Sequence, residues 1–127
     1  MAFLLGACFQ ASCWGIVINL DTHDKGGSHW VCLFFKVDKE KKEATMEYFD
    51  SIGTETCRSM VKCDKDNIPL EIIEFKNKLE LKLKKQGYKF DFNFNKKQHQ
   101  KKYNECGMYC IYYILNRVNN VPYDDKN

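Results

Sequence analysis

The sequence predicts an α+β domain in which a mostly antiparallel sheet packs on a buried C-terminal helix. Three patterns lead to this prediction: segments rich in β-branched and aromatic residues, one amphipathic helix, and one apolar helix near the end of the chain. The chain has 127 residues, of which 44% are hydrophobic and 29% charged, and this composition excludes a disordered chain or a coiled coil. We therefore expect one domain over residues 1–127, which is long enough to bury an ordinary core.

Strands are expected in four segments. Trp14–Leu20, His29–Val37 and Glu43–Asp50 are rich in strand-forming residues, and a charged turn joins the last two. Aromatic and polar residues alternate over Tyr88–Phe94, which is typical of a half-buried strand. The apolar opening, Met1–Leu20, is interrupted by polar residues and lacks a basic start, so we expect a buried strand and its lead-in rather than a signal peptide or a membrane span.

Two helices are expected. Leu70–Gln86 carries apolar residues at helical spacing on one face, and Gly87 suits the position after its last turn. Asn104 can cap the start of a second helix over Glu105–Asn119. This second helix is apolar nearly all round, so we expect it to be buried.

The register of the hairpin brings two polar residues together. If the turn centres on Lys39 and Glu40, Lys36 faces Glu43 as a favourable pair of opposite charges, and His29 faces Asp50. Side chains that face each other in a sheet have Cβ atoms about 4.5–5.5 Å apart. This distance suits an imidazole held by a carboxylate.

The start of the second helix favours a reactive thiol. Cys106 is expected at the second helical position, where free backbone N–H groups and the positive end of the helix dipole stabilise a thiolate. The same N–H groups can hold a developing oxyanion, and Gly107 lets a substrate approach the backbone closely. A cysteine nucleophile, a histidine base and an aspartate that orients the base are the parts of a thiol protease.

The remaining cysteines and histidines are expected to have no catalytic part. No C-x-x-C spacing occurs among the seven cysteines, so we interpret them as mostly reduced and expect an intracellular reducing compartment. His23 and His99 are expected at the surface. A zinc-binding structural protein is the third function that we consider.

Three motifs resemble those of one enzyme group. They are GGSHWV around His29, YFDSIG around Asp50 and QKKYNECGMYC around Cys106. They resemble the cysteine proteases that include adenovirus protease (adenain) and the ubiquitin-like-protein (SUMO) proteases. The resemblance covers about 14–115 and keeps the order His, Asp, Gln, Cys, and it implies the papain-like or adenain-like protease core.

The resemblance assigns a role to each matching residue. His29 would be the general base, Asp50 the residue that orients it and Cys106 the nucleophile. Gln100, six residues before the nucleophile, would be the oxyanion donor, with Gln98 as its rival. Trp30 and Gly107 would lie in the substrate cleft, although a packed aromatic residue is an equally good interpretation of Trp30.

The function that follows is a cysteine endopeptidase that processes viral precursor proteins at Gly-x-Gly or Gly-Gly sites. One alternative is a protease that removes a ubiquitin-like modifier, and another is a non-catalytic module that binds ubiquitin-like tails. No cofactor or metal is expected, and neither is a membrane partner. We expect a monomer, located in the host cytoplasm or the virion if the protein is viral, and either a minimal or an N-terminally truncated domain.

A basic segment near the nucleophile permits a further partner. Lys96, Lys97, Lys101 and Lys102 follow the last expected strand, and the net charge of the chain is +3. A solvated loop is the ordinary interpretation of such a segment, and nucleic-acid binding is the alternative.

Overall fold

The computed structural model describes residues 2–5, 12–20, 29–57, 62–99 and 106–119. In chain order the elements are β1 (Ala2–Leu5), β2 (Ser12–Asn19), β3 (Trp30–Asp38), β4 (Glu43–Phe49), α1 (Leu70–Lys85), β5 (Lys89–Phe94) and α2 (Cys106–Val118). The expected α+β class is confirmed, and the observed bounds differ from the expected ones by a few residues. Within the described ranges β1 is an additional strand, formed from part of the apolar opening.

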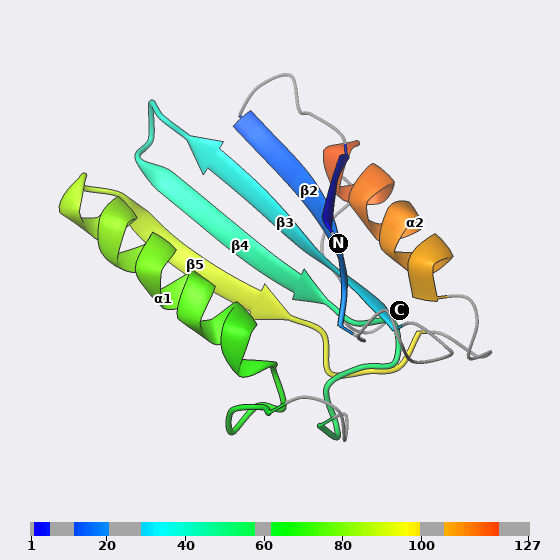
Figure 1. The fold of residues 1–127 in the computed structure, drawn as a ribbon. Coiled ribbons are helices and arrows are strands. Elements are labelled where there is room, and N and C mark those ends of the chain that lie inside the picture. The colour runs from blue at the N-terminus through cyan, green and yellow to red at the C-terminus, as the bar shows by residue number, and fades with distance from the viewer. Residues whose placement is uncertain (1, 6–11, 21–28, 58–61, 100–105, 120–127) are drawn as a thin grey trace.

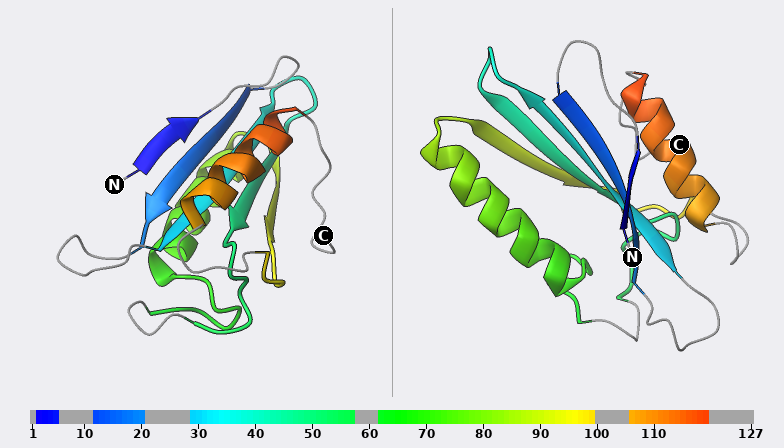
Figure 2. Two further views of the ribbon diagram at one scale, coloured as in Figure 1. Left: turned by 90° about the vertical axis from the view of Figure 1, so that its right-hand side faces the viewer. Right: turned by 45° about the horizontal axis from the view of Figure 1, so that its top comes forward.

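The strands of the described segments form a five-stranded sheet in the order β1-β2-β3-β4-β5. The first four strands are antiparallel neighbours, and β5 pairs with β4 in parallel. A parallel pair needs a crossover, and α1 supplies it. The two helices lie on opposite sides of the sheet (Figures 1 and 2).

The hairpin of β3 and β4 has a different register from the expected one. Lys36 pairs with Thr45 rather than Glu43, and Asp38 pairs with Glu43, which is a shift of two residues. Because side chains alternate with a period of two, an even shift leaves every residue on its expected face. The expected direct pairing of His29 with Asp50 is therefore wrong, while the expected shared face is right.

The turn explains this shift. The Asp38 carboxylate accepts hydrogen bonds from the backbone N–H groups of Glu40 (3.0 Å) and Lys41 (3.1 Å). Lys42 has a positive φ of 55°. These features form a four-residue loop, Lys39–Lys42, in place of the two-residue loop that we expected.

The end of α1 is built as the sequence predicts. Gly87 has a φ of +86°, and its N–H donates to the carbonyl of Lys84 at 3.0 Å. The N–H of Tyr88 donates to the carbonyl of Leu83 at the same distance. This pair of bonds is a Schellman motif, and it turns the chain from α1 directly into β5.

Each face of the sheet carries its own core. On the α1 side, buried residues of β3 and β4 pack with Ile68, Ile72 and Phe90. On the α2 side, Cys110 and Ile114 pack against the opposite face. The expected burial of the second helix is found along one face only, because in the described structure α2 packs against the sheet along that face. Its other face is exposed, and Met108 is 69% exposed.

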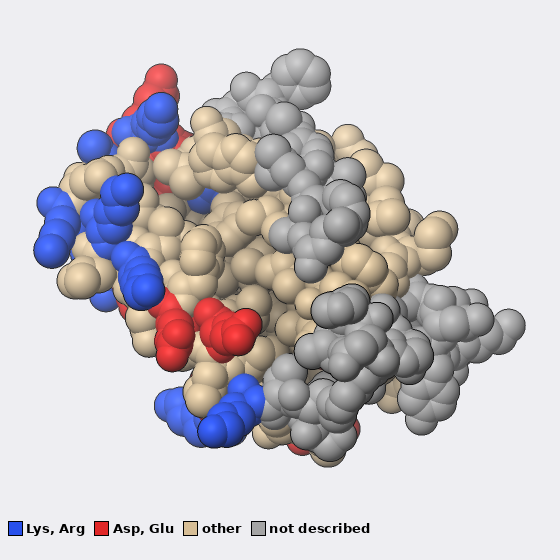
Figure 3. All heavy atoms as spheres, viewed as in Figure 1, with Lys and Arg blue, Asp and Glu red and all other residues tan. Residues whose placement is uncertain are grey.

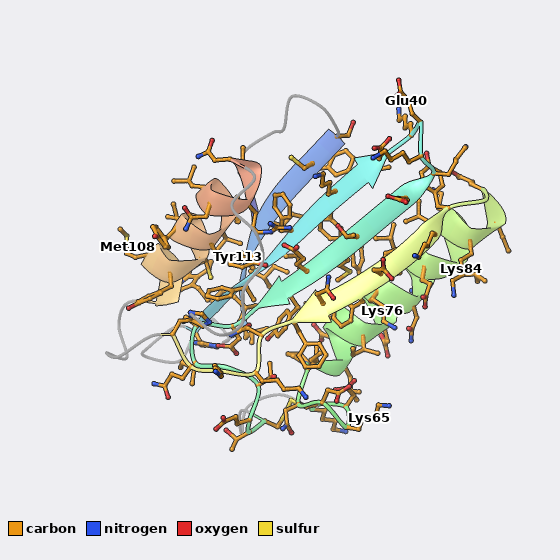
Figure 4. All side chains as sticks on the ribbon, turned by 180° about the vertical axis from the view of Figure 1, so that it is seen from behind. Glu40, Lys65, Lys76, Lys84, Met108 and Tyr113 are labelled. Carbon is orange, nitrogen blue, oxygen red and sulfur yellow. A yellow bond between two sulfur atoms is a disulfide. The ribbon has the colours of Figure 1, made fainter. Side chains whose placement is uncertain are left out.

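A buried carboxylate fixes α2 to the sheet. Glu47 of β4 is 2% exposed and accepts two hydrogen bonds from Nε of Arg117, at 2.8 and 3.1 Å, and one from its Nη2 at 2.6 Å. The hydroxyl of Tyr113 donates to the same carboxylate at 2.8 Å. The Tyr113 ring stacks on Phe49 with centroids 4.3 Å apart, and it lies between α2 and the sheet (Figure 4).

The pKa values of this network reflect its burial. Burial and the Glu47 carboxylate both raise the pKa of Tyr113, so its hydroxyl stays a donor. Burial alone lowers the pKa of Arg117, but the hydrogen bonds to Glu47 outweigh this and raise it. The network is therefore a charged pair with a neutral third donor.

The cysteines differ from the expectation in part. Cys32 and Cys110 are free and buried, but Cys57 and Cys63 form a disulfide with Cα atoms 6.0 Å apart, and Cys13 is also disulfide-bonded. An isolated antiparallel β-bridge also pairs Cys63 with Pro69, directly before α1. Neither helix of the described segments is long and apolar enough to cross a membrane.

We predict that Arg117→Met destabilises the fold by about 3–5 kcal/mol, because it leaves the Glu47 carboxylate buried without its cation. Denaturant unfolding measures this loss. The triple variant Glu47→Met, Arg117→Met and Tyr113→Phe removes every polar member of the network and should be more stable than the single variant. A single variant within 1 kcal/mol of the wild type would show that the pair does not hold α2.

Candidate active site

His29 and Asp50 form a buried pair at the ends of two neighbouring strands. His29 directly precedes β3 and Asp50 directly follows β4, and the two residues are 4% and 5% exposed. Nε2 of His29 lies 2.9 Å from Oδ1 of Asp50. An ionised carboxylate only accepts hydrogen bonds, so Nε2 of His29 carries a hydrogen and donates a hydrogen bond to Asp50.

The pair forms despite the shifted register. Cys32 pairs with Phe49, so the residue opposite Asp50 is Val31, two residues after His29. His29 and Asp50 are thus diagonal rather than direct neighbours, and both lie just outside the regular strands. Long side chains reach each other across such a diagonal.

The start of α2 lies beside Trp30, the residue after His29. A Cβ built on Gly107 would lie 3.8 Å from Cδ1 of Trp30, so the indole packs on the helix backbone at this point. The thiol of Cys110, one turn later, donates to the carbonyl of Trp30 at 3.4 Å. Trp30 therefore connects the first turn of α2 to the strand end that carries His29.

Cys106 is the first described residue of α2, and its side chain lies outside the described part of the structure. Gln100 and the expected cap Asn104 also lie outside it. Gln98 is exposed. Among the described residues, the structure thus brings His29 to Asp50, and it brings Trp30, the neighbour of His29, to the helix backbone at Gly107.

A second buried thiol beneath α2 is poorly suited to be a nucleophile. Burial raises the pKa of Cys32 well above its usual value, and a hydrogen bond with Cys110 raises it further. The thiolate is the reactive form of cysteine, so Cys32 is expected to be inert.

His99 differs from the expected surface residue. It is half-buried, its ring meets Phe49 edge-on with centroids 5.4 Å apart, and its N–H donates to the carbonyl of Ser51 at 2.7 Å. Its Nε2 is buried and has no hydrogen-bond partner among the described residues. The expectation was wrong because this loop folds against the Asp50 turn instead of extending into solvent.

Asn95, the residue directly after β5, has a role that the sequence does not predict. Asn95 is 1% exposed, and its Oδ1 accepts from the N–H of Asp50 at 2.9 Å. Its Nδ2 donates to the carbonyls of Asp50 (2.6 Å) and Lys97 (3.0 Å). No local pattern marks this residue, because its role arises only when β5 pairs with β4.

The basic segment is described in part. Lys96 and Lys97 are exposed, and Lys101 and Lys102 lie outside the described residues. In the view of Figure 3, basic side chains gather over the α1 side of the molecule.

Within the described ranges, no group of three or more His, Cys, Asp or Glu residues is placed to hold a metal ion.

The amino-acid sequence of the chain is similar to those of a group of viral proteins. The chain is 27% identical over 126 residues to the SUMO-1 cysteine protease S273R of African swine fever virus, isolate Pig/Kenya/KEN-50/1950. It is 29% identical over 111 residues to the cysteine protease S273R of the Badajoz 1971 Vero-adapted strain. The expected resemblance to the adenain and SUMO protease superfamily is confirmed. No protein-family model matches the chain.

Solved structures agree with this result. A crystal structure of the African swine fever virus pS273R protease matches 87% of the chain with a TM-score of 0.62 and 25% identity. The SUMO protease Ulp1 matches 88% with a TM-score of 0.50 and 22% identity, which is a likeness of fold alone. The chain spans only 41% of the length of the SUMO-1 cysteine protease S273R and 36% of the protein chain in the pS273R crystal structure.

We predict that Gly53→Ala destabilises the protein more than Gly87→Ala does. Both glycines have a positive φ, 83° and 86°, so alanine costs about 1–2 kcal/mol at either position. At Gly53 the new Cβ would also collide with the carbonyl oxygen of Lys96, whereas nothing lies within 4 Å at Gly87. Thermal or denaturant unfolding compares the two variants. Equal losses would contradict the close contact between the Asp50 turn and the segment after β5.

Proposed function

We propose that the chain is the catalytic part of a cysteine endopeptidase. In this proposal Cys106 is the nucleophile, His29 the general base, Asp50 the residue that orients it and Gln100 a donor to the oxyanion. The observation that carries the proposal is the buried hydrogen bond from His29 to Asp50, at 2.9 Å, beside the start of α2. The similarity to viral cysteine proteases supports it further.

The orientation of His29 suits this chemistry. Because Nε2 donates to Asp50, Nδ1 is the nitrogen that would accept the proton of the thiol. The Cys106 thiolate attacks the scissile carbonyl, and the imidazolium then protonates the leaving amine. Water, activated by the same imidazole, hydrolyses the acyl-enzyme and restores the thiol.

The oxyanion needs donors that are in place before the reaction. The backbone N–H of Cys106 at the helix start is one such donor, and the side-chain amide of Gln100 would be the second. A helix N-terminus also carries a partial positive charge, which favours both the thiolate and the oxyanion.

The proposed substrates are viral precursor proteins cut at Gly-x-Gly or Gly-Gly sites. Small residues would suit a substrate site beside Gly107, because the Trp30 ring packs directly on the α2 backbone there. A second candidate is a conjugate of a ubiquitin-like modifier. It is supported by the names of the relatives, one a SUMO-1 cysteine protease and another a SUMO protease. Parallel assays with a Gly-Gly precursor peptide and a SUMO conjugate distinguish the two.

We predict that an electrophile with a Gly-Gly recognition segment labels Cys106 faster than any other cysteine at neutral pH. The helix start and His29 favour its thiolate, whereas Cys32 is held as a thiol. Mass mapping of the labelled protein measures this selectivity. Cys106→Ala should retain the fold and lose cleavage of the Gly-Gly peptide.

The control for this experiment is the unfolded, reduced protein, in which all seven cysteines should react at similar rates. Equal labelling in the folded protein, or cleavage that persists in Cys106→Ala, would remove Cys106 from the proposed role. Selective labelling without any cleavage would favour the non-catalytic module that binds glycine-rich tails.

We predict that Gln100→Ala lowers kcat by about 10²–10³-fold, as is typical when one oxyanion donor is lost. Labelling of Cys106 should be unchanged, because alkylation forms no oxyanion. Gln98→Ala is the matched control: its side chain is exposed, and its kcat should stay within a few-fold of the wild type. A normal rate for Gln100→Ala beside a low rate for Gln98→Ala would move the donor to Gln98.

A further inference from the structure

The buried amide of Asn95 completes the pairing of β4 with β5 by means of a side chain. In the parallel register Tyr48 pairs with Phe94, so the next residues on both strands, Phe49 and Asn95, lie at the same edge of the sheet. At the next position the side-chain amide of Asn95, rather than the backbone of β5, makes the hydrogen bonds to the backbone of Asp50. Its Oδ1 accepts from the N–H of Asp50 and its Nδ2 donates to the Asp50 carbonyl, at 2.9 and 2.6 Å.

These contacts fix the backbone of the residue that orients the proposed base. The carbonyl of Asp50 accepts a second bond from the N–H of Gly53 at 2.8 Å, and its Oδ1 accepts one from the N–H of Ile52 at 2.9 Å. Asp50 is thus held at its N–H, its carbonyl and its carboxylate. The same carboxylate oxygen accepts from His29, so a rotation of the Asp50 backbone would move the imidazole.

Further hydrogen bonds hold the chain from Asn95 to His99 against the Asp50 turn. The hydroxyl of Thr54 donates to the carbonyl of Asn95 at 2.9 Å, and the N–H of Thr54 donates to the carbonyl of Lys96 at 3.2 Å. The N–H of His99 donates to Ser51. Asn95 is the one side chain of this group that bonds directly to the backbone of Asp50 among the described contacts.

We propose that Asn95 is a positioning residue that sets the direction of the Asp50 carboxylate, and through it the orientation of the His29 imidazole. This inference rests on the proposed function, in which His29 is the base. It predicts an effect on the rate of the chemical step without an effect on substrate binding, because Asn95 is buried beneath Asp50. A shift of about 1 Å in a catalytic group costs about 10²-fold in rate.

The test compares two variants of Asn95 with two matched controls. Asn95→Asp keeps the shape and the acceptor but loses both donors, and Asn95→Ala removes the amide. Asn93→Ala changes the same residue type at an exposed position of β5. Asn67→Gly removes a side-chain amide that donates to the carbonyls of Thr54 and Glu55, which follow the Asp50 turn. Glycine suits this position, because the φ of residue 67 is 60°.

Two readouts separate positioning from a loss of stability. The first is kcat, together with KM, per Cys106 that the electrophile with a Gly-Gly recognition segment labels ahead of the other cysteines, since only folded enzyme shows this selectivity. The second is the NMR signal of the His29 Nε2 proton, which is buried and hydrogen-bonded and is assigned by its absence in His29→Gln. Both Asn95 variants should lose about 10–10²-fold in kcat per site, keep KM within about twofold, and lose or shift the His29 signal. Both controls should keep the rate and the signal.

An unchanged kcat per site, or an unchanged His29 signal in folded Asn95→Asp, overturns this inference. The proposed function would still stand in that case, as long as the wild type cleaves and Cys106→Ala does not. If instead the wild type does not cleave, the proposed function fails, and the NMR signal alone decides whether Asn95 positions His29.

Discussion

The carboxylate of Asp50 is the group on which the candidate site depends. It is buried, and an isolated buried carboxylate is unfavourable unless its acceptors are paired. The structure supplies these partners through the imidazole of His29 and the N–H of Ile52, and it holds the backbone through Asn95. Each partner comes from a different segment, so the pairing of β3, β4 and β5 must be complete before the site exists.

A second buried carboxylate, that of Glu47, holds the helix that carries the proposed nucleophile. Glu47 of β4 lies three residues before Asp50, and it fixes α2 through Arg117 and Tyr113. One strand therefore supports both halves of the proposed machinery: its body holds the helix that begins at Cys106, and its end holds the base. This arrangement explains how groups that are far apart in sequence come to depend on the same strand.

The sequence predicted the fold better than it predicted the contacts. Periodicity identified α1 and the strands, because the apolar pattern reflects which face is buried. The hairpin register was wrong by two residues, since the side-chain bonds of Asp38 that lengthen the turn cannot be inferred from alternation. His29 and Asp50 were nevertheless correctly expected to come together, because an even shift preserves their face.

The errors at α2, at the cysteines and at Asn95 have a common cause. Each depends on what packs against the residue in three dimensions, and local sequence carries no record of this. The apolar residues around α2 led us to expect a buried helix, although the described structure covers only one of its faces. Asn95 resembles any polar residue after a strand until β5 is placed beside β4.

The most direct test of the account is to trap the acyl-enzyme. Rapid acid quench of the wild type with a Gly-Gly ester or peptide, followed by mass spectrometry, locates the acyl group on the chain. The account predicts a thioester on Cys106 that forms before product is released and is absent in His29→Ala. Product formation with no acylated cysteine, or acylation of a different residue, would contradict it.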